Sequence, residues 1–312
     1  ERIMLGKRRN SNFQNNKKIG EIMLSILIPI YQENCVNLIN DLLLQTKELS
    51  CQWEILVFDD CSPIKCEENK AIAQLPNVEY RELSENLGRS RIRNLLADTA
   101  KGDILIFLDG DSGIVRKDFL KRYLQAIETK DVVRGGTVYC SKDKCPKGYE
   151  LHWKYGTKVE SNRTLQGENM FTTNNFCIRK KIFSSVRFRQ DIKGYGHEDT
   201  LFKLDLEEFN FSFQNIDNPV EHLGLKTFKD FISSNENAIK TLRNISKNQR
   251  NKKIIQRIKI VNVYNKLEKY NLVGLYVLFY KITRRLMLSL LAQKNPSLFI
   301  LNLYKLGVYC TA

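Results

Sequence analysis

Short apolar runs that alternate with helix-like segments constrain the fold of this chain more than any other feature of its sequence. Two runs, LSILIPI at 24–30 and ILIFL at 104–108, contain almost no polar residue, as expected of strands covered on both faces. Segments of helical length lie at 36–49 and 90–100. Strands and helices that alternate at this spacing predict an α/β fold with a doubly wound sheet. Two further strands are predicted at 54–58 (EILVF) and 78–81.

The regular alternation loosens after residue 130. Strand-like pieces are predicted at 132–140, 175–178 and 211–216, and a helix is predicted at 199–209. From residue 225 onward the pattern is helical and basic, with Asn-rich breaks expected at 235–237 and 248–251. We therefore divide the chain into a basic N-terminal segment (1–20), an α/β domain (21–224) and a basic amphipathic helical region (225–312).

Positive charge is concentrated at the two ends of the chain. The net charge is +15, but residues 1–20, with six Lys/Arg and one Glu, carry +5, and residues 225–312, with 17 Lys/Arg and three acids, carry +14. The middle of the chain is therefore mildly acidic, at −4. This asymmetry indicates that the ends meet an anionic surface. Charge alone would also allow a nucleic-acid-binding protein, but the basic ends carry apolar stripes, so we expect no nucleic acid partner.

The apolar stretches of the basic C-terminal region are too short to cross a bilayer. One, 272–280 (LVGLYVLFY), stops at Lys281, and another, 286–292 (LMLSLLA), follows Arg284 and Arg285. A spanning helix needs about 18 or more apolar residues, whereas basic residues between shorter apolar runs are typical of helices that lie on a membrane. The alternative is that these helices bury their apolar stripe against the core of the protein.

The cysteines and the N-terminal segment favour a cytoplasmic location. Eight cysteines are present, and two pairs have C-x4-C spacing without the second pair or the histidines that a zinc site requires. Reduced thiols in the cytosol are the simpler interpretation. No signal peptide is visible, because the basic start leads into a predicted strand that contains Pro29.

Acidic residues follow three of the predicted strands at the point where each strand ends. They occur in Tyr31-Gln32-Glu33, Asp59-Asp60 and Asp109-Gly110-Asp111. Open α/β sheets bind their ligands beyond the carboxyl ends of the strands, and clustered carboxylates are costly unless a cation offsets them. Hard oxygen ligands favour Mg2+ or Mn2+, which commonly bridge diphosphates. Gly110 lets a ligand approach the backbone between the two aspartates.

No glycine-rich phosphate loop is present. The chain lacks G-x-G-x-x-G after the first strand and lacks G-x-x-x-x-G-K-[ST] altogether, which excludes dinucleotide-binding and P-loop proteins. Metal and arginine must therefore bind any phosphate. The segment 86–94 (NLGRSRIRN) supplies Arg89, Arg91 and Arg93 after Gly88, at a predicted helix N-terminus that suits an anion. Helix geometry does not allow all three arginines to face one cleft.

A second acidic motif lies in the loop GYGHED at 194–199. Its last two residues, Glu198 and Asp199, begin a predicted helix. One interpretation is that they only complement the positive end of the helix dipole. The other is that the loop supplies a general base, a carboxylate that deprotonates an incoming hydroxyl group.

Taken together, these motifs resemble the GT-A fold glycosyltransferases of family 2. The resemblance runs in order through SILIPIYQEN, FDDCSP, ENLGRSRIRN, FLDGD and GYGHED and covers roughly residues 24–224. Each motif alone is weak, but five in this order form a specific pattern. The resemblance implies a mixed, mainly parallel GT-A sheet flanked by helices, and an inverting transfer of a sugar from a nucleotide donor.

The resemblance also implies a role for each matching residue. Asp109-Gly110-Asp111 looks like the DXD motif, in which Asp111 binds the metal and Asp109 lies near the ribose and the metal shell. His222, in PVEHLG, matches a metal-binding histidine of some relatives, and Asp199 matches the catalytic base. Glu198, with Asp199, matches the family's ED motif, and we assign Glu198 and Tyr195 to acceptor or sugar binding. The Tyr195 assignment rests on the stacking of an aromatic ring on a sugar, and the alternative is that Tyr195 is a packing anchor. The residues matched to donor binding are Pro29, Tyr31, Glu33, Asp60 (base recognition), Gly88, Arg93, Asp109 and Gly110.

The resemblance finally implies the partners. The cofactor would be Mn2+ or Mg2+, and the donor a nucleotide sugar, with UDP as the family's commonest carrier. With the basic region 225–312 on an anionic membrane, we expect a saccharide or lipid-linked saccharide acceptor for a surface glycan or polysaccharide. The enzyme would then be cytoplasmic and peripherally bound to the inner face of the membrane.

Three alternatives remain. A sugar-nucleotide nucleotidyltransferase would need a glycine-rich loop with Arg or Lys after the first strand, where this chain has PIYQEN. A non-catalytic relative is disfavoured because both acidic motifs are intact. The C-terminal region could also mediate oligomerisation or bind a protein partner in place of a membrane.

Overall fold

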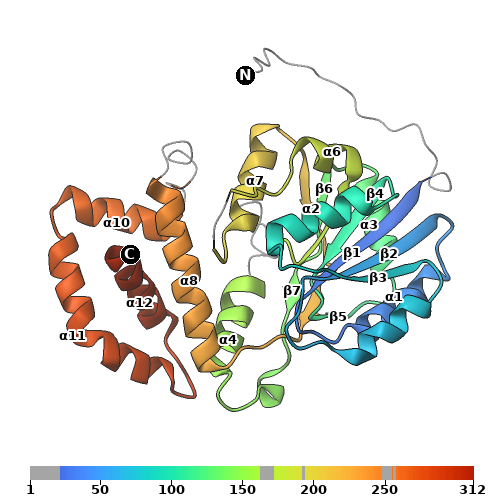
Figure 1. The fold of residues 1–312 in the computed structure, drawn as a ribbon. Helices are drawn as coiled ribbons and strands as arrows, with labels where there is room; N and C mark the ends of the chain where they lie inside the picture. Colours follow the sequence, from blue (N-terminus) through green and yellow to red (C-terminus); the bar gives the residue numbers. More distant parts are fainter. Residues whose placement is uncertain (1–21, 162–171, 192–193, 248–254, 256–257) are drawn as a thin grey trace.

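A computed structural model describes residues 22–161, 172–191, 194–247, 255 and 258–312. Figure 1 shows a central sheet with helices on both faces, and a group of C-terminal helices to one side of it. The sheet has seven strands in the order β3-β2-β1-β4-β8-β6-β9. Its strands are β1 (Met23–Ile30), β2 (Gln52–Asp59), β3 (Val78–Glu82), β4 (Ile104–Leu108), β6 (Val132–Arg134), β8 (Asn175–Arg179) and β9 (Phe213–Asn215).

The sheet is mainly parallel, as the sequence predicts. Strands β3, β2, β1 and β4 run in one direction, and β9 is parallel to β6. Only β8 runs antiparallel to both of its neighbours, β4 and β6. Together with the flanking helices, this arrangement confirms the predicted α/β fold class.

Both faces of the central strands are buried, which explains their nearly unbroken apolar sequences. Side chains alternate along each strand, so Ile26 and Ile28 pack on one face with helices α1 (Val36–Thr46) and α3 (Phe119–Ile127). Leu27 packs on the other face. The helices of that second face are α2 (Arg89–Thr99), α6 (Lys180–Ser185) and α7 (Glu198–Glu208).

The strand predicted at 132–140 is wrong in one respect, because it is broken at Gly135 into two strands of different sheets. A Cβ atom at Gly135 would lie 2.2 Å from the backbone oxygen of Asn218 and 2.4 Å from the hydroxyl of Tyr123. This close packing leaves room only for glycine. Beyond Gly135 the chain leaves β6 and joins a three-stranded sheet, in the order β5-β10-β7. These strands are β5 (Ser112–Ile114), β7 (Thr137–Val138) and β10 (Val220–His222).

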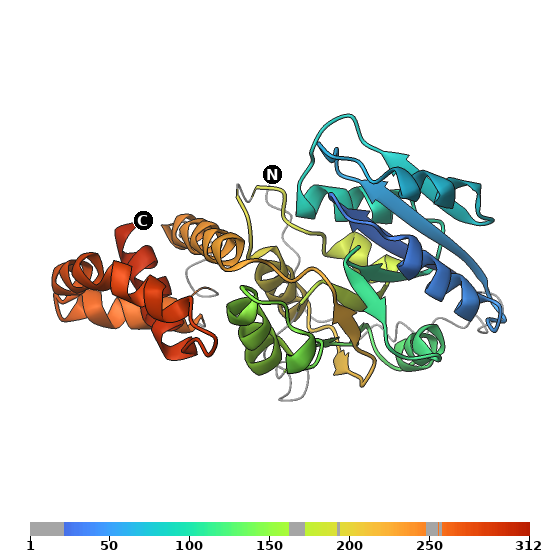
Figure 2. The same ribbon diagram turned by 90° about the horizontal axis from the view of Figure 1, so that it is seen from below.

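Short helical elements complete the part of the chain before residue 225. They are the 3-10 helices η2 (Glu67–Gln74) and η3 (Lys142–Lys144), helix α4 (Glu150–Tyr155) and the π-helical turn η4 (Gly156–Glu160). In Figure 2, α4 lies between the sheet and the C-terminal helices.

The C-terminal helices form a hydrophobic core of their own. They are α8 (Phe228–Lys247), α10 (Lys259–Lys269), α11 (Val273–Leu291) and α12 (Leu298–Thr311). Leu151 of α4 packs into the same core, and the division of the chain at residue 225 stays a prediction. Among the described helices, none combines the length and the hydropathy required to span a bilayer.

The break predicted at 235–237 is wrong, because α8 continues through it. Asn235 does not end the helix, and its side-chain amide donates a hydrogen bond to the backbone oxygen of Phe231, one turn earlier, at 2.8 Å. Burial of Phe231, Ile232, Ile239 and Leu242 along one side of α8 outweighs the weak helix propensity of asparagine. The break predicted at 248–251 lies outside the described residues.

Candidate active site

Three strands end side by side at the carboxyl edge of the sheet. The backbone N–H of Asp60, after β2, donates to the backbone oxygen of Ile30, the last residue of β1, at 2.9 Å. Asp109 follows β4, which pairs with β1 on its other side. Pro29 lies within β1, and Tyr31 projects just beyond it with 45% of its surface exposed. The acidic residues predicted to converge therefore share this edge.

Asp60 fixes the loop that leads into α2. Its two carboxylate oxygens accept hydrogen bonds from the backbone N–H groups of Leu87, at 2.7 Å, and Gly88, at 2.9 Å. Burial raises the pKa of Asp60, although these two hydrogen bonds oppose the shift. Gly88 has a positive φ of 77°, which favours glycine. Asp60 thus positions the start of α2, and its predicted contact with a nucleotide base stays a prediction.

The two arginines on one side of α2 differ in exposure. Arg93 is only 2% exposed, and its guanidinium bonds the carboxylate of Asp109 and the backbone oxygen of Arg89. Arg89, one turn earlier, is half exposed and forms an ion pair with Glu198 at 3.4 Å. Arg93 therefore orients Asp109, and Arg89 is the arginine that can reach a ligand. The match of Arg93 to donor binding stays a prediction, and the side of α2 that faces the sheet does not follow from the sequence.

Asp111 and His222 come together through the small sheet. Residue Ser112 of β5 pairs with His222 of β10, and the Nδ1 atom of His222 lies 3.3 Å from Oδ2 of Asp111. Burial raises the pKa of Asp111, but the hydrogen bond and charge of His222, together with Arg89, outweigh burial and lower it. Burial lowers the pKa of His222, but its bond to Asp111 outweighs burial and raises it. Each side chain therefore favours the charged form of the other.

Two residues that the sequence did not single out, Gly224 and His152, pack against this pair. Gly224 lies against Asp111, so that a Cβ atom at Gly224 would be 2.1 Å from Oδ2 of Asp111. His152 of α4 accepts a hydrogen bond at Nδ1 from the backbone N–H of Lys226, at 2.8 Å. Burial, with the nearby His222 and Lys226, lowers the pKa of His152 to about 3, so it is a neutral acceptor. The sequence alone gives no signal for either contact, since both depend on tertiary packing.

Glu33 and Gly110 lie in contact at the same edge. A Cβ atom at Gly110 would be 2.7 Å from Oε2 of Glu33 and 2.5 Å from the side chain of Ile30. Burial raises the pKa of Glu33 to about 8, and the negative charges of Asp111 and Asp109 add to the shift. Glu33 thus keeps its proton beside two carboxylates, and a cation bound at this edge would favour its ionised form.

The loop before α7 adds the second acidic motif. Gly194, Gly196 and His197 all have positive φ values, so the glycines are required by the turn that carries Tyr195. The guanidinium of Arg89 lies 4.8 Å from the ring centroid of Tyr195, and Nζ of Lys226 donates to its hydroxyl at 3.2 Å. Tyr195 therefore joins α2 to the segment that follows β10.

Glu198 and Asp199 occupy the first turn of α7. Oδ1 of Asp199 accepts from the backbone N–H of Thr200 at 2.6 Å. Glu198 is buried; burial raises its pKa, but the charges of Arg89 and Arg93 outweigh burial and lower it. Because the charge of Arg89 acts on both Glu198 and Asp111, the loop and the strand ends belong to one electrostatic neighbourhood.

A divalent ion fits this site only with help from its substrate. Within the described part of the chain, no three His, Cys, Asp or Glu side chains are grouped so that they could hold a metal by themselves. Asp111 and His222 offer one carboxylate and one imidazole. Mg2+ sites in phosphate-binding enzymes commonly use one or two carboxylates, with phosphate oxygens and water as the other ligands, so the pair fits an ion that a diphosphate completes.

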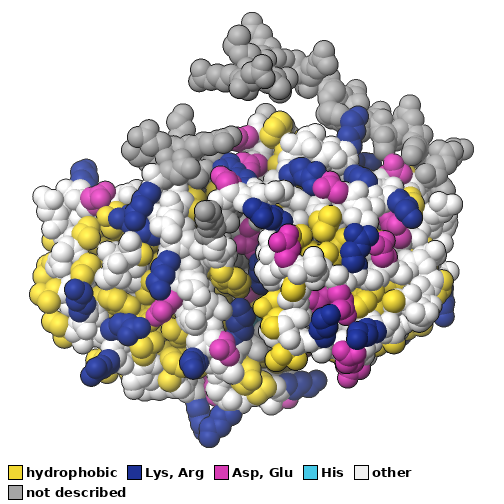
Figure 3. Space-filling model, in the orientation of Figure 1, with side chains coloured by type: hydrophobic (Ala, Val, Ile, Leu, Met, Phe, Trp, Pro, Cys, Tyr) yellow, Lys and Arg dark blue, Asp and Glu magenta, His cyan; other side chains and the backbone are white. Residues whose placement is uncertain are grey.

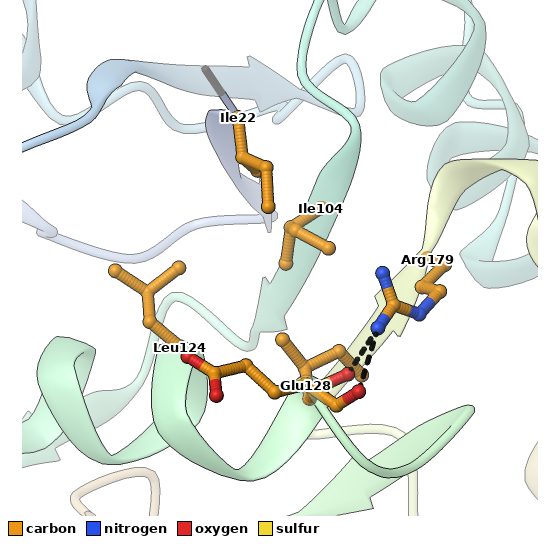
Figure 4. Close-up of a pocket in the computed structure, with 6 residues that line it drawn as sticks. Ile22, Ile104, Leu124, Glu128 and Arg179 are labelled. Atoms are coloured by element: carbon orange, nitrogen blue, oxygen red, sulfur yellow. Dashed lines mark hydrogen bonds between the residues drawn. The ribbon is translucent and has the colours of Figure 1, made fainter. Parts of the chain in front are cut away.

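The pocket drawn in Figure 4 lies at the other end of the sheet. Ile22 and Ile104 line it near the amino ends of β1 and β4, and Arg179 closes one side by donating to the backbone oxygens of Ile127 and Glu128. None of the predicted site residues lines it. It is therefore not the candidate active site.

Comparison with known proteins identifies the family. Residues 25–187, just over half of the chain, match the family described as Glycosyl transferase family 2. The chain belongs to this family, and it is therefore a transferase of glycosyl groups. A curated relative, an uncharacterized glycosyltransferase of Haemophilus influenzae, is 24% identical over 227 residues, which cover 68% of this chain and 71% of the relative.

One solved structure supports the fold, and a second is reported beside it. A mannosyltransferase from Pyrobaculum calidifontis, PcManGT, solved in complex with GDP-Man and Mn2+, is 12% identical, has a TM-score of 0.58, and aligns over 93% of this chain and 86% of its own. TarS from S. aureus is 18% identical with a TM-score of 0.45; the alignment covers 72% of this chain but only 39% of TarS. The likeness to PcManGT, with the observed sheet, confirms the predicted GT-A fold.

Replacing Gly224 by alanine is expected to weaken metal-dependent nucleotide binding. The new Cβ atom would collide with Oδ2 of Asp111 and displace a proposed metal ligand, which should lower affinity by about 10- to 100-fold. Calorimetric titration of a nucleoside diphosphate with Mn2+ measures the effect. Gly274→Ala is the matched control, because nothing lies within 4 Å of its Cβ position. Equal affinity in the two variants would contradict the placement of Asp111.

Glu33→Gln is expected to flatten the dependence of stability on pH in metal-free protein. The folded chain retains a proton on Glu33 up to about pH 8, whereas the ordinary pKa is 4.5. The folded state therefore binds more protons than the unfolded state between these values, and stability is lost as pH rises through them. Thermal unfolding measured between pH 4.5 and about pH 8 should show a smaller loss of stability in Glu33→Gln than in wild type. The exposed Glu48→Gln should behave like wild type, and identical slopes in all three would show that Glu33 is not the cause.

Proposed function

We propose that this glycosyltransferase is metal-dependent and inverting, and that it transfers a sugar from a nucleotide sugar, with UDP favoured, to a hydroxyl group of a saccharide or lipid-linked saccharide. One observation carries the proposal. Asp111 and His222, which are distant in the sequence, lie 3.3 Å apart at the carboxyl edge of the sheet, and Arg89 links this pair electrostatically to the acidic turn of α7.

The donor would be bound at the strand ends. Asp111 and His222, with Asp109 nearby, would hold Mn2+ or Mg2+, which when bound would neutralise the charge of the departing diphosphate. Arg89 is exposed at the N-terminal end of α2, where a guanidinium and a helix N-terminus both favour an anion. The structure of PcManGT with GDP-Man and Mn2+ supports the choice of a nucleotide sugar and a divalent ion.

Asp199 would act as the general base. In a single in-line displacement it would accept the proton of the acceptor hydroxyl while that oxygen attacks the anomeric carbon from the face opposite the diphosphate, and this geometry inverts the anomeric configuration. The hydrogen bond from the N–H of Thr200 to Oδ1 orients the Asp199 carboxylate. Glu198, paired with Arg89, would fix the turn between donor and acceptor.

The acceptor would lie beside the loop that carries Tyr195. The ring is 36% exposed, and its contacts with Arg89 and Lys226 fix its orientation. The exposed part of the ring would pack against a sugar. An acceptor for a surface glycan or polysaccharide, carried on a lipid at the inner face of a membrane, would agree with the positive charge of residues 225–312.

A thermal-shift screen of nucleotide sugars with Mn2+ tests the proposed function. A uridine diphosphate sugar is expected to raise the melting temperature, and a chelator is expected to remove the shift, because ligand binding to the folded state stabilises it. Stabilisation by a nucleotide sugar that is unchanged by the chelator would contradict the proposed metal dependence. The absence of any shift across uridine, guanosine and other nucleotide sugars would contradict the donor class.

A further inference from the structure

Helix α11 exposes a continuous apolar face to solvent. Five large side chains on this helix are between 43% and 72% exposed: Leu275, Leu278, Phe279, Ile282 and Leu286. At about 100° per residue, their spacing places all five within an arc of about 100° on one side of the helix. We call this set the α11 apolar face. Single exposed apolar residues are ordinary on a protein surface, but a contiguous set marks an interaction site.

The opposite side of α11 is already buried, so the helix cannot rotate to hide this face. Tyr280 and Met287 lie in the core of the C-terminal helices, and a Cβ atom at Gly307 of α12 would be only 2.0 Å from the ring of Tyr280. The hydroxyl of Tyr276 also donates to the backbone oxygen of Leu303 at 3.0 Å. The interpretation that the apolar stripe packs on protein therefore holds for one side of α11, and the membrane interpretation stays a prediction for the exposed side.

Positive charge borders the α11 apolar face. Lys281 and Arg285 are exposed and lie next to each other along one edge of it, whereas Arg284 is turned toward the protein, where it pairs with Glu236 at 3.3 Å. Figure 3 shows hydrophobic side chains along the left edge of the molecule, where Figure 1 places α11, with Lys and Arg among them. Apolar residues beside basic ones are the pattern of helices that lie at an anionic bilayer surface.

We propose that the α11 apolar face docks into the interfacial region of an anionic lipid bilayer, with Lys281 and Arg285 at the level of the head groups. Charge selects this occupant over a second copy of the chain, because residues 225–312 carry a net charge of +14, and two such regions repel each other. The same charge is attracted to an anionic leaflet. This proposal depends on neither the donor nor the acceptor, so it can fail or hold independently of the proposed reaction.

Vesicle flotation with the full chain tests the proposal. The wild type is expected to float with vesicles of phosphatidylcholine and phosphatidylglycerol, and much less with phosphatidylcholine alone. The double variant Leu278→Ser/Ile282→Ser should lose binding by at least about tenfold, because two apolar side chains no longer enter the bilayer. The matched control is Leu44→Ser/Ile64→Ser, which changes two equally exposed apolar residues outside the C-terminal helices and should float like wild type.

A second pair of variants tests the charge. Lys281→Gln/Arg285→Gln should weaken binding to the anionic vesicles by about fivefold per residue removed, and added salt should reduce the difference. Lys47→Gln/Lys101→Gln, two exposed lysines of the sheet domain, should have no effect. Circular dichroism and thermal unfolding confirm that the variants are folded.

Three results would overturn the proposal. The first is a wild type that does not float with anionic vesicles, and the second is a Leu278→Ser/Ile282→Ser variant that floats as well as wild type. The third is a dimer, measured by light scattering, that this variant dissociates, since the face would then bind a second copy of the chain.

Discussion

Replacement of Asp199 by asparagine is expected to lower turnover by about 100-fold or more, the contribution that a positioned general base typically makes. The amide keeps the size of the side chain and can still accept from the N–H of Thr200, but it cannot take the acceptor proton. Donor affinity should stay almost unchanged, since the proposed donor contacts lie at the strand ends. Initial rates with a nucleotide sugar, together with calorimetric titration of the nucleoside diphosphate and Mn2+, measure the two effects separately.

Glu208→Gln is the matched control for this variant. It removes a carboxylate from the exposed far end of the same helix, and turnover should remain at the wild-type level. If Asp199→Asn instead weakened nucleotide binding as much as it lowered turnover, Asp199 would belong to the donor site. Full activity in Asp199→Asn would place the base elsewhere.

Asp111→Asn should abolish the metal-dependent part of nucleotide binding. Loss of even an outer-shell partner of a metal ligand costs up to about 100-fold in affinity, so loss of a proposed ligand should cost at least that much. The substitution also removes the negative charge that raises the pKa of His222. The imidazole then loses its proton more readily, but a neutral imidazole does not replace the lost carboxylate as a ligand. Calorimetric titration of a nucleoside diphosphate, with and without Mn2+, gives the metal-dependent difference directly.

The control for Asp111→Asn is Asp41→Asn, on the exposed side of α1. It changes the net charge of the protein by the same amount, so a general electrostatic effect would appear in both variants. If Mn2+ still increases nucleotide affinity in Asp111→Asn as it does in wild type, this carboxylate is not a metal ligand.

The sheet was predictable because local and tertiary preferences agree there. Strand β4 begins and ends where its apolar run does. Both of its faces are buried, so each of its apolar side chains is placed in the core. The prediction failed where tertiary contacts decide the outcome. Nothing in the sequence around Gly135 distinguishes it from a residue inside a strand. In the structure its neighbours leave no room for a Cβ atom, and the chain passes from one sheet to the other at this point.

The site was predictable in its residue types but less so in its geometry. Strand ends placed the carboxylates at one edge, as expected of parallel strands. The contact between Asp111 and His222, however, depends on a three-stranded sheet that pairs residues more than 100 positions apart. The difference in exposure between Arg89 and Arg93 depends on which side of α2 meets the sheet. Neither of these is encoded in a local motif.

We propose that Asp111 and His222 hold one divalent ion together with the diphosphate of a sugar donor. A crystal structure with Mn2+ and uridine diphosphate, with anomalous diffraction data to locate manganese, tests it most directly. We expect one anomalous peak in contact with the carboxylate of Asp111, the imidazole of His222 and a diphosphate oxygen. Bound nucleotide with manganese away from Asp111 and His222, or with no manganese beside its diphosphate, would show that these residues do not hold a metal with the donor.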